Sequence, residues 1–190
     1  MVFALGVLVV FFSQTAIIFY ISFYPLDRSF TDTSLAFYIA AIFNAGSVLG
    51  RILPNTLSDR IGVFNTISPL TVLLGVTMLC LLDVRNLAGI VVEAVVTGFF
   101  SGVVIALPPV CFHVLTENKS MIGTCMGQGF TISGLGLLSG GPSAGGILGT
   151  AEPLNWTGLW VIGGVMACGA RLIHGCVRIM RSGTALNIKV

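Results

Sequence analysis

The chain has 190 residues, of which 55% are apolar and 8% are charged, and its formal net charge is +2. Soluble domains carry about 25% charged residues, so this composition excludes a soluble globular enzyme and a disordered segment. The small net charge provides no basic face for a nucleic-acid backbone. A mean hydropathy of +1.02 therefore indicates an integral membrane protein in contact with the lipid bilayer.

Charged residues and prolines divide the chain into apolar stretches. Because a transmembrane helix needs about 20 apolar residues, the length predicts six spans, at about 1–24, 34–57, 66–82, 87–112, 120–148 and 157–177. The sequence thus predicts an all-α transmembrane fold, with one bundle over 1–178 and a cytoplasmic tail over 179–190. The first apolar stretch starts at Met1 without a basic segment before it. This start predicts that the chain is truncated upstream.

Basic residues near the span ends predict the orientation, since cytoplasmic loops carry an excess of Lys and Arg. Arg28 and Arg85 fall on one side, and a larger group falls on the other: Arg60, Lys119, Arg178, Arg181 and Lys189. Both termini are therefore predicted to be cytoplasmic. The sequence leaves the plasma membrane and the vacuolar membrane open as locations.

The first and fourth spans each contain polar residues within an apolar stretch. Gln14 is a weak candidate for a cavity wall, because buried amides often bond to a neighbouring helix. Glu93, Thr97 and Ser101 follow one another at a spacing of four residues, on one helix face. The carboxyl group of Glu93 could carry a proton or pair with a cation, or it could lie near the outer interface.

The second span carries a polar stripe. Asn44, Ser47, Arg51, Asn55 and Ser58 are three or four residues apart, which keeps them on one side of a helix. Charged groups inside a membrane usually face a bundle interior or a water-filled path. The stripe therefore predicts the wall of an aqueous cavity with Arg51 at its centre. The alternative is an arginine that extends to the interface.

The fifth span is rich in glycine, which permits close helix packing. Its core, Gly140-Gly141-Pro142, is followed by Gly145 and Gly146. Proline removes one backbone hydrogen bond, so this segment is predicted to be a pliable part of the helix. Simple helix packing is the alternative.

The sequence shows no chemistry of an enzyme. Its five cysteines are scattered singly, and no Ser/His/Asp set, phosphate loop or metal motif is present. We therefore expect no catalytic residue, no metal site and no cofactor.

The turn between the second and third spans is diagnostic. Asn55-Thr56-Leu57-Ser58-Asp59-Arg60-Ile61-Gly62-Val63 resembles the cytoplasmic G-x-L-A-D-R-x-G-R signature of the major facilitator superfamily (MFS). Leu57, Asp59, Arg60 and Gly62 match it, whereas Asn55 and Val63 depart from it. Further stretches, in order along nearly the whole chain, resemble the C-terminal half of fungal monocarboxylate-permease-like transporters: 44–51, 98–102, 107–110, 122–127 and 156–160.

The resemblance implies that the spans are helices seven to twelve of that fold, arranged as two inverted three-helix repeats. It implies that Arg51 binds a substrate carboxylate, and that Asp59, Arg60 and Gly62 belong to a cytoplasmic gate. In monocarboxylate transporters an acidic residue one turn before this arginine takes part in proton coupling. Ser47 occupies that position here. The segment 141–146 also fits a GPxxGG motif of proton-coupled drug antiporters.

The leading hypothesis is the C-terminal half of a secondary active transporter for a small organic solute, an anion such as a carboxylate, that works by rocker-switch alternating access. The predicted solute-binding residues are Arg51, Asn44, Ser47, Asn55, Gln14 and Glu93. The expected partners are the solute, a missing N-terminal half or a second copy, and a proton as a candidate coupling ion. The alternatives are a non-transporting paralogue that pairs with a full transporter, and half of a drug or metabolite antiporter.

Overall fold

The computed structural model describes residues 2–150 and 152–182, in which every regular element is a helix. The long helices are α1 (Val2–Tyr20), α3 (Thr33–Ile61), α4 (Val63–Cys80), α5 (Leu87–Leu115), α6 (Ile122–Leu148) and α7 (Trp156–Ser182). The short elements are α2 (Phe23–Asp27), η1 (Leu81–Asp83) and η2 (Lys119–Met121). Six helices are long and apolar enough to cross a membrane, which confirms the predicted all-α transmembrane class.

The helix boundaries differ from the predicted spans at several places. The first span is interrupted at Ile21 and Ser22, and α2 follows the interruption. Pro25 lies in the first turn of α2, where its missing N–H leaves no helix bond unmade. The second span extends to Ile61, since its polar last turn remains helical. The predicted tail starts inside α7, and residues 183–190 lie outside the described residues.

One residue connects α3 to α4. Gly62 has φ 95° and ψ 146°, a conformation that only glycine adopts without strain. Its N–H donates to the carbonyl of Ser58, and its carbonyl accepts from the N–H of Thr66. The glycine of the predicted gate motif is therefore required by the backbone, because it reverses the chain within a single residue.

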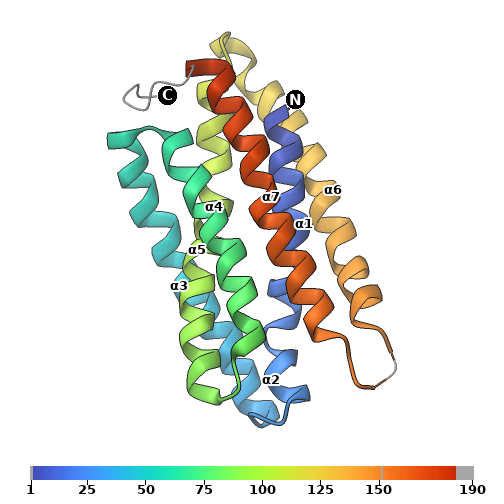
Figure 1. Ribbon diagram of the computed structural model, residues 1–190. Helices are drawn as coiled ribbons and strands as arrows, with labels where there is room; N and C mark the ends of the chain where they lie inside the picture. Colours follow the sequence, from blue (N-terminus) through green and yellow to red (C-terminus); the bar gives the residue numbers. More distant parts are fainter. Residues whose placement is uncertain (1, 151, 183–190) are drawn as a thin grey trace.

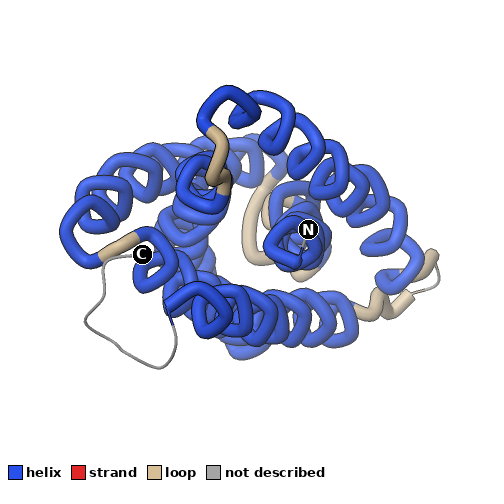
Figure 2. Tube along the Cα trace, turned by 90° about the horizontal axis from the view of Figure 1, so that it is seen from above, coloured by secondary structure: helices blue, strands red, loops and turns tan. Residues whose placement is uncertain are grey.

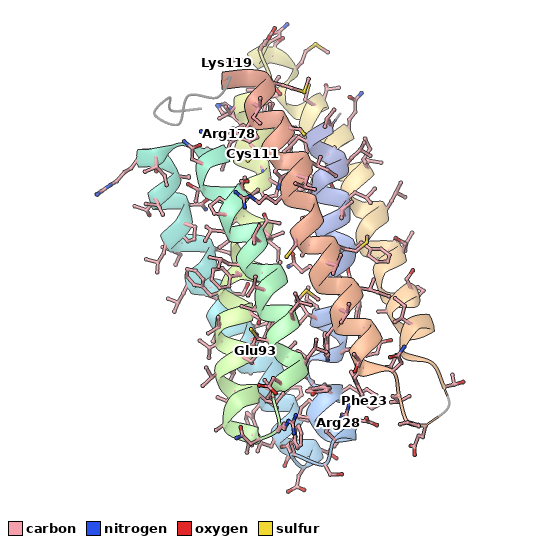
Figure 3. The ribbon with its side chains drawn as sticks, viewed as in Figure 1. Phe23, Arg28, Glu93, Cys111, Lys119 and Arg178 are labelled. Carbon is pink, nitrogen blue, oxygen red and sulfur yellow. The ribbon has the colours of Figure 1, made fainter. Side chains whose placement is uncertain are left out.

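The helices alternate in direction, so α1 begins and α7 ends at the same end of the bundle (Figure 1). We call this end, which carries Lys119 and Arg178 in Figure 3, the inner end, and the opposite end, which carries Arg28, the outer end. Viewed along the bundle, α1 lies among the other helices (Figure 2). The most extensive interfaces join α3 to α5, α1 to α6 and α4 to α7.

Glycines set the distance between the helices at two of these interfaces, α3–α5 and α1–α6, and they do so in the same way. A side-chain atom added at Gly46 or Gly50 of α3 would collide with the carbonyl of Val95 or Phe99 on α5. An atom added at Gly136 or Gly140 of α6 would collide in the same way with the carbonyl of Leu8 or Phe12 on α1. The α3–α5 interface therefore repeats as α6–α1, as expected for two inverted three-helix repeats, α1–α3–α4 and α5–α6–α7.

The same correspondence locates the pseudo-two-fold axis that relates the repeats. Gln14 lies two residues after Phe12, and Ser101 lies two residues after Phe99, so they are equivalent positions. Gln14 Nε2 donates to Ser101 Oγ at 2.7 Å, and both side chains are 1% exposed. Gly75 of α4 and Gly164 of α7 also face each other, because each approaches the carbonyl of the other. Both contacts lie on the axis.

The glycine contacts predict a difference between two neighbouring positions of α6. Gly136 faces the carbonyl of Leu8, whereas nothing lies within 4 Å of an atom added at Gly134. Both substitutions with leucine raise helix propensity, but only Gly136→Leu must push α1 and α6 apart. We expect Gly136→Leu to lower the midpoint of thermal unfolding in detergent by several degrees and Gly134→Leu to leave it unchanged. Equal midpoints would contradict the interface described for α1 and α6.

The axis contact predicts a reversible exchange. Gln14→Ser removes the bond to Ser101, and interhelical bonds of this kind contribute about 0.5–2 kcal/mol in membranes. Because the two positions are equivalent, the double variant Gln14→Ser with Ser101→Gln can form the same bond in the opposite direction. We expect the double variant to regain most of the lost stability, measured by thermal unfolding. A double variant no more stable than the sum of the single changes would argue against the axis contact.

Candidate functional site

The polar stripe of α3 is divided between two environments. Asn44 and Arg51 are exposed, whereas Ser47 and Ser58 are buried, Ser47 at the contact with α5. The amide groups of Asn44 and Asn55 donate to carbonyls of their own helix, those of Ala40 at 2.9 Å and Arg51 at 2.8 Å. The oxygen Oδ1 of Asn55 is buried and has no partner among the described residues.

The guanidinium of Arg51 makes no hydrogen bond or ion pair with any residue in the described part of the chain. In contrast, Arg85 at the outer end lies 3.8 Å from Asp83. Gly102 packs on the carbonyl of Ser47 and Gly50 on that of Phe99, so Ser101 is level with about Leu49 and Arg51 lies roughly 3 Å further towards the inner end. The structure thus holds an uncompensated guanidinium at membrane depth on an exposed face of α3.

Glu93 lies far from Arg51 in this conformation. Helices α3 and α5 run in the same direction, and Gly98 packs on the carbonyl of Phe43. Gly46 in turn packs on the carbonyl of Val95, so Glu93 is level with about Ala41, and about ten residues, or roughly 15 Å along the axis, separate it from Arg51. Glu93 is half-buried and accepts a hydrogen bond from Thr97 Oγ1 at 2.8 Å. Figure 3 shows it in the outer part of the bundle.

Gln14 is buried in the bundle at the pseudo-two-fold axis. Its Oε1 has no partner among the described residues, although its Nε2 bonds to Ser101. The preceding residue is Ser13, whose Oγ donates to the carbonyl of Gly163 and so connects α1 to α7. The polar groups of α1 therefore hold helices together in this conformation.

The predicted gate residues lie at the inner end. Asp59 and Arg60 are exposed, and neither has an ion pair with another described residue. A hydrogen bond that the sequence did not reveal lies beside them. Arg178 Nε donates to Asn65 Oδ1 at 2.6 Å, and Asn65 Nδ2 donates to the carbonyl of Ile61. This pair fastens the inner end of α7 to the first turn of α4.

The glycines of α6 fall into two groups. Gly136 and Gly140 pack against α1 and Gly129 packs against the ring of Phe112, so these positions are occupied interfaces. The others are open, with nothing within 4 Å of an added side-chain atom: Gly123, Gly127, Gly134 and Gly146. Gly141 and Gly145 are intermediate, near Phe19 and the hydroxyl of Tyr20. The helix runs without a break through Pro142.

An aromatic cluster lies at the outer end of the bundle. Trp156 Nε1 donates to Asp27 Oδ2 at 2.6 Å, and the Trp156 ring stacks on that of Trp160 at 5.9 Å between centroids. Tyr24 donates to the carbonyls of Leu81 and Val84, both at 3.3 Å. Burial raises the pKa of the Tyr24 phenol above its ordinary value, and the nearby Arg28 opposes this shift. The sequence signal for this cluster was the group of aromatic residues around Pro25.

Two open cavities flank α6. The outer one, of about 600 Å³, is a groove between α1–α2 and α6 lined by Phe19, Tyr20, Phe23, Leu137, Leu138, Gly141 and Pro142. The inner one, of about 440 Å³, is lined by residues that include Phe3, Phe112, Glu117, Asn118 and Gln128. Within the described residues no group of three His, Cys, Asp or Glu side chains is arranged to hold a metal.

Comparison with known proteins gives relatives that cover most of the chain. It is 49% identical to "MFS-type transporter dbaD" of Emericella nidulans over 91% of its own length and 39% of the relative. It is 31% identical to "Aspyridones efflux protein apdF" of the same organism, over 82% of the chain and 33% of the relative. It is 33% identical to "Agnestins efflux protein AgnL12" of Paecilomyces divaricatus, over 86% of the chain and 36% of the relative.

No family model matches the chain. The chain spans about two fifths of the length of the first of these relatives, or 39%. The relatives are named as transporters and not as enzymes. The helices and these relatives together identify the chain as an integral multi-pass membrane protein, homologous over nearly its whole length to fungal proteins named MFS-type transporters.

Proposed function

We propose that the chain acts as the C-terminal six-helix half of a secondary active transporter of the MFS, monocarboxylate-permease-like in type, which moves a small organic anion. The observation that carries the proposal is Arg51, exposed at membrane depth on α3 without a partner among the described residues. A charged group there is costly unless it faces an aqueous path or binds an anion. The named relatives and the inverted repeats support a transporter.

In this proposal Arg51 holds the carboxylate of the solute by charge-assisted hydrogen bonds, which its planar guanidinium can form in pairs. Asn44 and Asn55 lie on the same side of α3. Asn44 offers its amide oxygen to the solute or to water, whereas the buried oxygen of Asn55 becomes available only when its surroundings rearrange. Ser47 and Gln14 are buried in interfaces, so they reach the path only when α3–α5 or α1–α5 contacts rearrange during transport.

Alternating access would come from rocking of this half against a second half. Asp59 and Arg60 extend from the inner end of α3, where they can meet and leave charged groups of that second half, and Gly62 forms the turn between them and α4. The segment with Gly140, Gly141, Pro142, Gly145 and Gly146 provides a part of α6 that can change its packing. Both termini would be cytoplasmic.

Proton coupling is assigned to Glu93 in this proposal. Ser47 occupies the position one turn before Arg51, so no carboxyl group is present there. Glu93 is the half-buried carboxyl group within the described spans, and it accepts a hydrogen bond from Thr97. Its distance from Arg51 means that protonation would act through the helices and not by a direct ion pair. Solute and proton would thus bind at separate sites.

Export is the direction favoured by the comparisons, because two of the relatives are named as efflux proteins. This observation also favours the second candidate function, a metabolite–proton antiporter half. The two functions differ in whether the solute and the proton move in the same direction.

The test uses a chimera in which this chain replaces the matching segment of the relative that is 49% identical. Cells that express the chimera are loaded with carboxyfluorescein, an aromatic carboxylate, and its export is followed by fluorescence. We expect Arg51→Ala to slow export at least tenfold, since a charge-assisted bond contributes about 1.5–3 kcal/mol. Arg51→Lys should retain part of the activity because it keeps the charge.

Arg85→Ala is the matched control, since Arg85 is exposed at the outer end and pairs with Asp83. It should leave export unchanged at equal expression in the membrane. Equal export by Arg51→Ala and the parent chimera would reject the anion-binding role. A parent chimera that reaches the membrane but exports nothing would favour the other hypothesis, a non-transporting paralogue that pairs with a complete transporter.

A further inference from the structure

The inverted repeats make a second position equivalent to that of Arg51. Gly50 of α3 corresponds to Gly140 of α6, because each packs on a carbonyl of the helix opposite. The next residue in each helix is Arg51 and Gly141. A rotation about the pseudo-two-fold axis exchanges the inner and outer ends of the bundle. It leaves unchanged the side of the bundle that a residue faces along the axis. Gly141 therefore lies on the side of the bundle that Arg51 faces, in the outer half.

Three of the five stripe positions follow the same pattern: Asn44 corresponds to Gly134, Arg51 to Gly141 and Asn55 to Gly145, whereas Ser47 and Ser58 correspond to Leu137 and Leu148. Arg51 and Asn55 therefore make the inner half of this surface polar and cationic, whereas Gly141 and Gly145 leave the outer half apolar. The absence of side chains at these glycines leaves space on this surface of α6.

The outer groove occupies that space. Gly141 lies in its wall beside Leu137, Leu138 and Pro142, and Phe19, Tyr20 and Phe23 form the opposite wall. Figure 3 shows Phe23 at the outer end of the bundle. The volume of about 600 Å³ is within the range of sites that bind drug-sized molecules. The wall contains three aromatic rings and no charged residue.

We infer that this outer groove binds the aromatic or polycyclic part of the transported solute, at a site separate from Arg51. Aromatic rings pack favourably in offset or edge-on contact with Phe and Tyr, and the missing side chain at Gly141 lets a flat ring approach the backbone of α6 at that residue. The inference rests on the proposed function, because it assigns the groove to the path that Arg51 faces. A solute would then use the cationic inner site and the aromatic outer site at different stages of transport.

Lipid tails and a second helical half are the competing occupants of an apolar groove, and the geometry distinguishes them from a solute. Phe19 is 65% exposed and Leu138 75% exposed, so the rim of the groove is open. The groove has a wall of three aromatic rings, Phe19, Tyr20 and Phe23, whereas the surface of α3 at Val48, Leu49 and Ile52 is uniformly aliphatic. Continuity with the Arg51 side favours the solute.

The test is photolabelling with benzophenone, a neutral aromatic probe, on the 190-residue chain in lipid nanodiscs and on the chimera. Labelled sites are located by mass spectrometry of the peptides. We expect saturable labelling at Leu137, Leu138 and Pro142 of α6 and in the segment 19–23. Gly141→Leu should reduce this labelling at least fivefold, because its side chain fills the groove; an atom added at Gly141 lies 3.5 Å from the Phe19 ring, so the fold is retained.

Gly127→Leu is the matched control, since Gly127 lies on the same helix in open space outside the groove. It should label like the parent chain. Phe19→Ala is the second variant, and it should weaken labelling without affecting the fold because Phe19 is largely exposed.

Three outcomes would overturn the inference. Labelling that rises linearly with probe concentration and ignores Gly141→Leu would show lipid-like partition. Quenching of Trp156, which lies 5.6 Å from Phe23, by lipids brominated in the acyl chain in the parent but not in Gly141→Leu would show that a lipid tail fills the groove. Loss of labelling in the chimera would show that a second half covers it. Arg51→Ala tests the proposed function separately, since it should slow export at least tenfold while groove labelling persists.

Discussion

Close approach of helix backbones at glycine is the constraint on which this bundle depends. In a lipid environment no hydrophobic effect drives helices together, so packing contacts and interhelical hydrogen bonds must do so. The α3–α5 and α1–α6 interfaces bring a glycine of one helix onto a carbonyl of the next, and Gly75 and Gly164 do the same for α4 and α7. These contacts fix the register of the helices, and the register in turn fixes the depth of Arg51, Glu93 and Gln14.

Depth then separates the chemical roles. The arginine and the half-buried glutamate are on neighbouring helices, but the register separates them by about ten residues, or roughly 15 Å. Between them lies the Gln14–Ser101 bond at the axis. Under the proposed function, an anion, a proton and the apolar part of the solute would bind at three separate levels, coupled by movement of the helices and not by direct contact.

Hydropathy alone was sufficient to predict the helical class and the number of spans, because long apolar runs bounded by charges have no other stable form in a membrane. Periodicity placed Ser47 and Arg51 on one stripe, but it could not show that α5 covers the Ser47 edge. It also treated the glycines of α6 as one group with one role. Only the neighbouring helices distinguish Gly136, which packs against α1, from Gly134, which is open.

The remaining features depend on contacts between distant segments. The bonds of Arg178 to Asn65 and of Trp156 to Asp27 join residues more than a hundred positions apart, and no local pattern marks such partners. The break after Tyr20 was hidden because Ile21, Phe23 and Tyr24 continue the apolar run. The correspondence of the two repeats was equally hidden, since what they share at these interfaces is a pair of glycines four residues apart and little else.

Every extensive interface in this bundle joins one three-helix repeat to the other. During synthesis, therefore, α1, α3 and α4 leave the ribosome before the helices that they contact most extensively. Those helices, α5, α6 and α7, follow later in the sequence, so membrane insertion of the first repeat and its packing are separate events.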